Sequence, residues 1–252
     1  MEKIYQLKNL LERKIMILDG AMGTMIQKEK LKENDFRNER FKNHKNNLYG
    51  NNDILNLTQQ KLIYDIHTLY LDAGADIIET NTFNSTKISQ ADYNCEDLVF
   101  ELNFEGGKIA RKAVDDFIKK NPNESKYVAG VLGPTNRTCS MSPDVNNPGF
   151  RNISFDELYD DYKKSTEALI QAGVDIIMVE TVFDTLNAKA ALNAIESACK
   201  NSNKIVPIMI SATITDLSGR TLSGQTIEAF YNSVMHINPL SVGLNCALGP
   251  KE

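Results

Sequence analysis

The stretch QAGVDIIMVET at Gln171–Thr181 runs from the end of an amphipathic segment, through a glycine, into a continuous run of Ile, Met and Val. The stretch DAGADII at Asp72–Ile78 has the same arrangement earlier in the chain. In both, Gly stands where a helix would end and an apolar strand would begin. Strands that are apolar on both faces are typical of parallel sheets built from repeated βα units.

The same unit recurs on either side of these two stretches. Six apolar runs of strand length are present: Lys14–Asp19, Asp76–Thr82, Tyr127–Gly133, Asp175–Thr181, Val206–Ile214 and Ser241–Cys246. Segments with helical spacing of apolar residues separate them, namely Gln59–Ala73, Leu98–Lys119, Ser154–Ala172, Leu186–Lys200 and Thr226–His236. Ser154 and Glu157 also fit a capping box at the start of a helix. The pattern predicts an α/β protein with a parallel sheet.

Six βα units fit either an open doubly wound sheet or most of an eight-unit barrel. Two observations favour the barrel. The turn at Asp19–Gly23 lacks the GxGxxG spacing of a dinucleotide fold, and polar residues follow several different strands. The polar insertion Lys28–Leu55 is expected to cover the barrel mouth. We therefore predict one domain over residues 1–252, of the (β/α)8 TIM-barrel type, which stops after about six βα units.

Composition excludes several classes of protein. The 252 residues carry a formal charge of −5 and no basic face, which argues against nucleic acid as a partner. No apolar run approaches membrane-spanning length, and the charged N-terminus lacks the features of a signal peptide. The four cysteines are widely separated, which excludes a disulfide framework and predicts reduced thiols. These features predict a soluble, cytoplasmic protein without a membrane partner.

Polar side chains lie at the carboxyl-terminal ends of the predicted strands and should meet at one rim of the sheet. This set suits a zwitterionic ligand: a carboxylate such as Glu180 can hold an ammonium group, and the peptide N–H groups of the Asp19–Ala21 turn can hold a carboxylate beside Gly20. Asp19 and Glu180 also have a purely structural reading, as a strand boundary and a helix cap. The rim set is Asp19, Glu79, Asn81, Glu180, Thr213, Asn245 and Cys246. Glu79 is the weaker candidate, because the sequence does not fix which face of its strand it occupies.

Cys246 ends the last predicted strand, where a thiolate would face the rim. A buried, unreactive cysteine is the alternative, and it is the commoner one for a lone Cys. The other three cysteines receive no chemical role, and the three histidines are too scattered to suggest a His-rich metal site.

Several stretches resemble the homocysteine-binding domain of cobalamin-dependent methionine synthases. They include LDGAMGTMIQ at Leu18–Gln27, AGADIIETNTFNST at Ala73–Thr86, GVLGPTNRTCSMSPDV at Gly130–Val145, AGVDIIMVETVFDTLNAKAAL at Ala172–Leu192 and VGLNCALGP at Val242–Pro250. The DG turn occurs in all homocysteine S-methyltransferases, including the betaine-using kind. The stretches Ser142–Leu158 and Ser218–Thr226 resemble the cobalamin type specifically.

The resemblance implies a zinc ion held by three cysteine thiolates, with the sulfur of homocysteine as its fourth ligand. Cys246 matches the first thiolate, and the family's other two form a Cys-Cys pair downstream of Glu252. Glu180 would hold the substrate ammonium, and Asp19 and Gly20 would help to seat the amino acid. Methylcobalamin and methyltetrahydrofolate would bind on other modules of the same polypeptide.

One cysteine cannot build a tetrahedral zinc site, so we expect this chain alone to bind no zinc in the family's manner and to be nearly inactive. Open sheet edges could also drive dimerisation. The alternatives are a standalone homocysteine methyltransferase that uses betaine or S-methylmethionine, and a non-catalytic amino-acid-binding barrel. An aldolase-type barrel would need a lysine at a strand end, and the six runs offer none.

Overall fold

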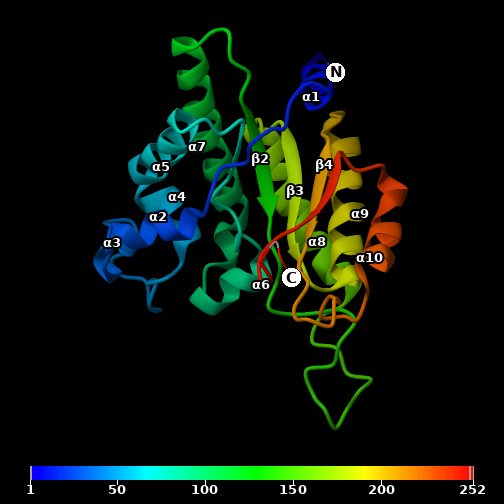
Figure 1. Ribbon diagram of the computed structural model, residues 1–252. Helices are drawn as coiled ribbons and strands as arrows, with labels where there is room; N and C mark the ends of the chain where they lie inside the picture. Colours follow the sequence, from blue (N-terminus) through cyan, green and yellow to red (C-terminus); the bar gives the residue numbers. More distant parts are fainter. Residues whose placement is uncertain (1, 250, 252) are drawn as a thin grey trace.

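The computed structural model describes residues 2–249 and 251. In this part of the chain five parallel strands form one sheet in the order β1-β2-β3-β4-β5 (Figure 1). They are β1 Ile77–Glu79, β2 Tyr127–Leu132, β3 Ile176–Val182, β4 Ile208–Ala212 and β5 Ser241–Leu244. The spatial order follows the sequence order without the reversal that defines a doubly wound sheet. This confirms the predicted α/β barrel type, although the described strands do not close a barrel.

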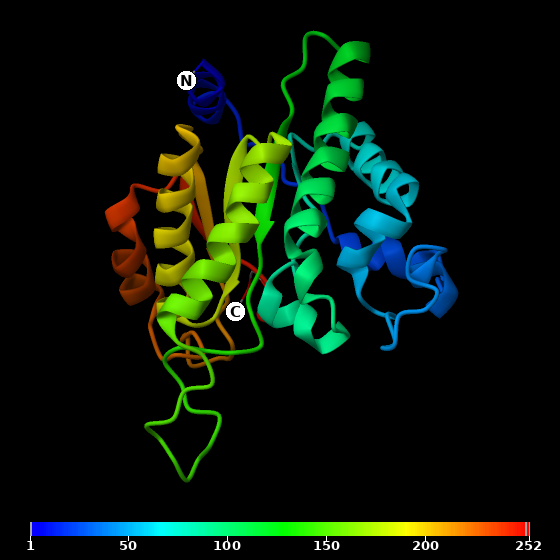
Figure 2. The same ribbon diagram turned by 180° about the vertical axis from the view of Figure 1, so that it is seen from behind.

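A helix before β1 and a helix between each pair of successive strands cover one face of the sheet, as Figures 1 and 2 show together. They are α5 Gln60–Asp72, α7 Val99–Lys120, α8 Phe155–Ala172, α9 Thr185–Ser202 and α10 Ile227–Val234. Helix α8 begins with the predicted capping box of Ser154 and Glu157, and it ends at Gly173 with φ of 91°. Only glycine adopts that left-handed conformation readily, which explains the shared helix-to-strand boundary.

The prediction of a strand at residues 14–19 is wrong. Residues 14–19 lie beside β1, but Leu18 makes a single parallel bridge to Ile77 instead of a strand. The amide of Asp19 donates to the carbonyl of Ile77 across 2.9 Å, so the backbone still follows the sheet edge. Ile15 is 88% exposed and Ile17 is 55% exposed. Met16 and Leu18 pack against the same apolar cluster as Leu7 of the N-terminal helix, so only part of this apolar run is covered.

Alternate residues of each strand face opposite sides of the sheet. The outer side packs against α7, α8 and α9 in the largest apolar cluster, which includes Ile78, Val128, Ile177, Val179 and Ile210. The inner side forms a smaller cluster with Leu7 of helix α1 (Glu2–Leu11), and it includes Ile77, Tyr127, Ala129, Ile176 and Met178. Glu79 and Glu180 each follow an inner residue by two positions, so both are in phase with the inner side.

The insertion at residues 28–55 has its own apolar core. Its elements and their neighbours are α2 Met22–Lys28, α3 Glu33–Arg37, η1 Asn52–Ile54 and α4 Leu55–Thr58. Phe36, Leu48 and Ile54 pack with Ile63 of α5 and Leu102 of α7. The carboxylate of Glu33 also accepts hydrogen bonds from the amides of Leu48 and Tyr49. The insertion is therefore a packed layer beside the sheet, continuous with helices α5 and α7.

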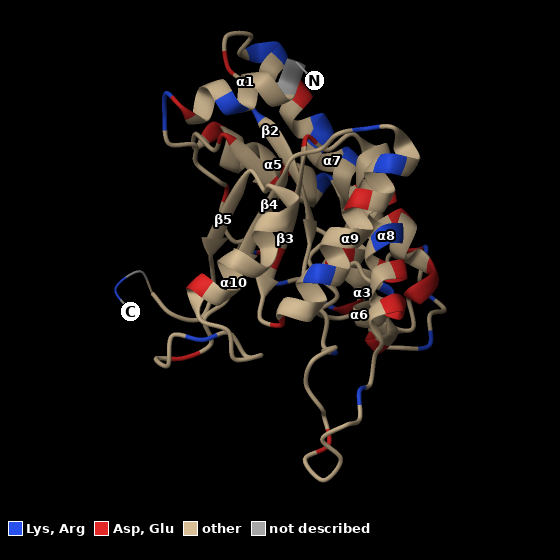
Figure 3. Cartoon of the chain, turned by 90° about the vertical axis from the view of Figure 1, so that its right-hand side faces the viewer, with Lys and Arg blue, Asp and Glu red and all other residues tan. Residues whose placement is uncertain are grey.

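Short helices and turns complete the described chain: α6 Lys87–Gln90, η2 Ala91–Tyr93, η3 Glu96–Leu98 and η4 Met235–Ile237. A long loop between β2 and α8 hangs below the carboxyl-terminal ends of the strands (Figure 1). Figure 3 shows acidic and basic segments interspersed on the helices, whereas the side formed by β5 and α10 carries little charge. Among the described helices, none combines the length and the apolar character needed to cross a membrane.

Candidate functional site

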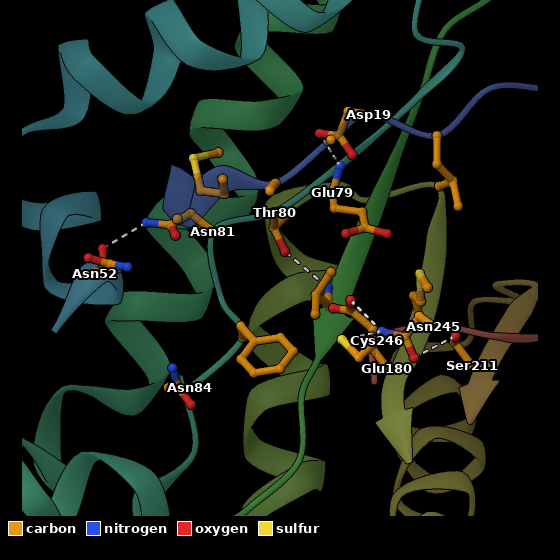
Figure 4. Close-up of a pocket in the computed structure, with 18 of the residues that line it drawn as sticks. Asp19, Asn52, Glu79, Thr80, Asn81, Asn84, Glu180, Ser211, Asn245 and Cys246 are labelled. Atoms are coloured by element: carbon orange, nitrogen blue, oxygen red, sulfur yellow. Dashed lines mark hydrogen bonds between the residues drawn. The ribbon is translucent and has the colours of Figure 1, made fainter. Parts of the chain in front are cut away.

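A cavity of about 490 Å³ opens at the carboxyl-terminal ends of the strands, with Val131 and Met178 among its apolar wall residues. All six residues that the sequence predicted for the site line it: Asp19, Gly20, Asn81, Glu180, Asn245 and Cys246. They come from the segment before α2, from the ends of β1 and β3, and from the turn after β5. Figure 4 shows the side chains of five of them, all but Gly20, around the cavity. Residues far apart in sequence thus share one rim, as barrel folds arrange them.

The cavity wall is acidic. Four carboxyl groups line it, from Asp19, Asp53, Glu79 and Glu180, and the lining contains no Lys, Arg or His. Carboxylates that share a poorly hydrated space repel one another, and each loses solvation energy. Such a wall favours either a cationic ligand or bound protons.

Asp19 is held by the backbone of the neighbouring strand. Its Oδ2 accepts a hydrogen bond from the amide of Glu79 at 3.1 Å. Its Oδ1 is buried and has no hydrogen-bond partner among the described residues. Burial raises the pKa of Asp19 to about 7, against the opposing effect of that amide, and the charge of Glu180 raises it further. Only one of the two carboxyl oxygens of Asp19 therefore receives a hydrogen bond that stabilises its ionised form.

Glu180 lies at an irregularity of β3. The register between β3 and β4 shifts between Val179 and Val182. Thr181, inside this bulge, has φ of 57°, which is unusual for a β-branched residue. Bulges near sites often redirect a side chain. Burial raises the pKa of Glu180, while a hydrogen bond from Asn245 opposes that effect.

Asn245 connects three strand ends through its side-chain amide. Its Nδ2 donates to Oγ1 of Thr181 at 2.7 Å and to Oε1 of Glu180 at 3.1 Å, and it lies 3.4 Å from Sγ of Cys246. Its Oδ1 accepts from the hydroxyl of Ser211 at 2.9 Å. The predicted rim residue Thr213 donates its hydroxyl to the Asn245 carbonyl at 3.2 Å, and it lies behind the wall. Asn245 thus fixes the rim between β3, β4 and β5.

Cys246 is an exposed, reduced cysteine on the cavity rim. Its backbone has φ of 57°, and its Sγ lies 3.7 Å from Oγ1 of Thr181. Cys95 and Cys139 are buried elsewhere, and burial raises the pKa of each thiol to about 11, which makes them poor metal ligands. No group of three His, Cys, Asp or Glu suited to a metal ion occurs among the described residues. Of the three thiolates that the family resemblance implies for a zinc ion, the described residues bring one, that of Cys246, to the cavity.

Asn81 and Gly20 have structural partners in the wall. The amide of Asn81 donates to the carbonyl of Asn52 at 2.8 Å and to Oδ1 of Asn56 at 3.2 Å. At Gly20, a Cβ atom would lie 2.9 Å from the ring of Tyr70, whose hydroxyl donates to the carbonyl of Ala21. Asn81 thus links the residue stretch 52–56 to the end of β1 by hydrogen bonds, and the absence of a side chain at Gly20 leaves room for the ring of Tyr70.

Sequence reasoning underrated Glu79 and missed Asp53. Alternation from Ile77 would have placed Glu79 on the inner side, had the inner face been known. Asp53 lies in the polar insertion, where no periodic pattern singles it out. Its Oδ1 accepts from the hydroxyl of Ser85 at 2.6 Å and from the amide of Asn84 at 2.9 Å. Complete burial raises the pKa of Asp53 to about 6.

Comparisons with known proteins address the fold and the family of the chain. The oxidised form of the homocysteine methyltransferase MmuM from Escherichia coli is 21% identical, with a TM-score of 0.72, over 95% of this chain and 76% of that one. Its metallated form gives the same identity and TM-score over 95% and 77% of the two chains. At this identity the likeness shows the fold alone. A sequence model described as homocysteine S-methyltransferase matches residues 16–252. The chain therefore belongs to the homocysteine S-methyltransferase family.

Proposed function

We propose that residues 1–252 form the homocysteine-binding, thiolate-activating domain of a cobalamin-dependent methionine synthase. The observation that carries this proposal is the junction at Asn245, which joins the carboxylate of Glu180 to the thiol of Cys246 in one cavity. The family membership supports methyl transfer to homocysteine. The stretches 142–158 and 218–226, which resemble the cobalamin type, support the finer assignment.

The cavity would receive the amino-acid end of homocysteine on its acidic side. Glu180 and Asp19, which both line the cavity, would accept hydrogen bonds from the substrate ammonium. Charge-assisted hydrogen bonds of this kind are short and strong in a poorly hydrated site. The backbone turn at residues 19–21 lines the same cavity and would donate to the substrate carboxylate. The side chain of homocysteine would then point along the rim toward Cys246.

Cys246 would contribute one thiolate to the zinc ion that the family resemblance implies. Zinc in such a centre keeps the homocysteine sulfur deprotonated at neutral pH. The side chains of Thr181 and Asn245 would position this thiolate. Oγ1 of Thr181 lies 3.7 Å from the Cys246 sulfur, and Nδ2 of Asn245 lies 3.4 Å from it. Methylcobalamin and methyltetrahydrofolate, on further modules of the polypeptide, are part of this proposal as the methyl sources.

The main alternative is a standalone homocysteine methyltransferase that uses S-methylmethionine or betaine. The fold shared with MmuM is the observation in its favour. The reading frame downstream of codon 252 separates the two proposals. A second barrel and a cobalamin-binding region would support the methionine synthase, and an early stop after one barrel would contradict it.

Binding of the amino-acid end can be tested without zinc, by two-dimensional NMR with millimolar L-methionine. We expect shift changes at residues around the cavity with L-methionine and none with N-acetylmethionine, which lacks the ammonium group. Glu180→Gln should weaken binding roughly tenfold, since it removes a charged partner. Equal responses to the two ligands would contradict the proposed site.

Association with other chains is a separate part of the proposal. Both edges of the sheet carry exposed apolar side chains, including Ile15, Ile17 and Leu244. Exposed strand edges favour pairing with another chain. A dimer through these edges, or contact with further modules of the polypeptide, would cover them. Sedimentation at several concentrations tests the dimer, and a monomer throughout would contradict it.

A further inference from the structure

Glu79 differs from the other three acidic residues of the cavity in its hydrogen bonding. Asp19 accepts from the amide of Glu79, Asp53 accepts from Ser85 and Asn84, and Glu180 accepts from Asn245. Within the described part of the chain, no donor reaches the carboxyl group of Glu79. Hydrogen bonds to a carboxylate stabilise its ionised form, so Glu79 is the group with least support for a negative charge.

The surroundings of Glu79 add repulsion to this lack of donors. Asp19 on the segment before α2 and Glu180 on β3 both raise its pKa by their charges, after the larger effect of burial. Asp53 on η1 and the thiol of Cys246 line the same cavity, and Tyr70 of α5 lies beside Gly20 and Asp19. No basic side chain lines the cavity. No positively charged side chain of the described wall therefore offsets a negative charge on Glu79.

A proton is the simplest neutralising partner for the empty cavity, and a substrate ammonium is the other. Figure 4 shows the Glu79 carboxyl group directed into the space between Asp19 and the Asn245–Cys246 rim. An ammonium group placed there would supply both the missing hydrogen-bond donor and the missing positive charge. Because the cavity cannot favour both positive charges at one carboxyl, binding of one should expel the other.

We propose that Glu79 is a further substrate-contacting residue, which holds a proton in the empty cavity and releases it to solvent when the substrate's ammonium group binds. This inference rests on the proposed function, because it assumes an amino acid as the ligand. The proton leaves the Glu79 carboxyl group, the carboxylate then accepts a hydrogen bond from the ammonium, and no other bond changes. Burial raises the pKa of Glu79 to about 8, in keeping with a protonated side chain at neutral pH.

The sign of the pH dependence follows from this exchange. Below the pKa of Glu79, methionine must displace the proton, so its affinity should rise with pH, by up to roughly tenfold per pH unit. Above about pH 8 the group is already ionised, and the dependence on Glu79 should fade. Methionine is a better probe than homocysteine, because its thioether has no ionisable proton. Protons released on binding can then be assigned to the protein.

The experiment is a titration of the chain labelled with ¹³C at the glutamate carboxyl carbons, with and without saturating L-methionine. Glu79→Gln assigns the resonance. We expect the Glu79 carboxyl to be protonated at pH 7 in the free chain and ionised at pH 7 with methionine bound. Glu79→Gln should remove one proton's worth of pH dependence from the affinity. The matched control is Glu196→Gln on the exposed face of α9, which should keep it.

Three outcomes oppose the inference in distinguishable ways. A Glu79 carboxylate that is already ionised at pH 6.5 in the free chain would overturn it directly. Methionine binding, reported by the backbone shifts around the cavity, with Glu79 still protonated would overturn it while leaving the proposed function intact. No methionine binding at any pH would contradict the proposed function and the displacement together. Circular dichroism of each variant shows whether it folds, and the titration of the unmodified chain needs no variant to fold.

Discussion

Asn245 donates from its side-chain amide to Oε1 of Glu180 across 3.1 Å, and so joins the turn after β5 to the bulged end of β3. The next residue in the chain is Cys246. The hydrogen bond therefore ties the carboxylate proposed to bind the substrate's amino group to the thiol proposed to bind at its sulfur end. A shift of either group would be transmitted to the other through one amide.

The first prediction concerns this amide. Asn245→Ala should weaken methionine binding roughly tenfold, because Glu180 loses the hydrogen bond that it accepts from the Asn245 amide. The hydrogen bonds from Asn245 to Thr181 and from Ser211 to Asn245 are lost as well. Asn245→Asp should also weaken binding, because an ionised carboxylate cannot donate the hydrogen bond that Glu180 accepts from Asn245. The measurement is the dissociation constant from NMR titration. Asn201→Ala on α9, whose amide makes an exposed hydrogen bond to Glu167, is the control and should leave binding unchanged. Equal effects at positions 245 and 201 would contradict the role of Asn245.

The second prediction concerns stability at the end of β2. A Cβ atom on Gly133 would lie 2.0 Å from the carbonyl oxygen of Phe83, which is backbone and cannot swing aside. Gly133→Ala should therefore reduce the free energy of unfolding by about 3 kcal/mol. The control is Gly149→Ala in the exposed loop, where the nearest atom to a Cβ is 4.0 Å away. The measurement is the midpoint of urea unfolding of the two variants. Similar midpoints would contradict the predicted clash at position 133.

The third prediction concerns acid stability. His67 is fully buried in α5, and neither ring nitrogen has a partner among the described residues. Burial lowers the pKa of His67 to about 4, from 6.5. The unfolded chain therefore binds the extra proton first. As pH falls from 6.5 to 4, His67 should cost stability, up to roughly 3 kcal/mol, and the loss should level off below pH 4.

His67→Leu should remove this part of the acid sensitivity. We expect the difference in unfolding free energy between the variant and the unmodified chain to grow as pH is lowered from 7 to 4.5. Asp19, Asp53 and Glu79 have raised pKa values and act in the opposite direction, so the comparison must be made between variants and not on one curve. The control is His236→Leu at an exposed position. A pH-independent difference would contradict the assignment.

Much of the fold could be predicted from sequence because its signals are local. The apolar run at 175–181 and the glycine at 173 define a helix end and a strand wherever they occur. The segment at 14–19 carries the same apolar signal and lies beside β1, yet it makes a single bridge and leaves Ile15 and Ile17 exposed. Apolar periodicity reports that a segment can be buried, and the rest of the chain decides whether it is.

The residues of the site likewise divide into those that local sequence predicts and those that depend on long-range packing. Polar residues at strand ends, such as Glu180 within β3 and Asn245 just after β5, could be predicted to line the cavity because the rim of a parallel sheet collects them. Asp53 was missed because it reaches the cavity through packing of the insertion, a long-range property with no local pattern. Glu79 needed the inner face of the sheet to be known, and only the clusters on the two faces fix that. The hydrogen bonds that distinguish Asp19, Asp53 and Glu180 from Glu79 cannot be predicted from the sequence either.

The last prediction concerns zinc. Catalytic zinc sites hold the metal with three protein ligands, and the described residues bring one thiol to the cavity, from Cys246. The 252-residue chain, dialysed after exposure to zinc, should therefore retain well below one ion per molecule. Metal analysis of the chain is the measurement, with Cys246→Ser and Cys199→Ser compared alongside. Any residual zinc should be the same in all three proteins, because weak surface binding does not depend on one rim thiol. Stoichiometric zinc that is lost in Cys246→Ser and kept in Cys199→Ser would show that the cavity's carboxylates complete a metal site with Cys246, and the acidic wall would then have to be assigned to the metal instead of to an ammonium group.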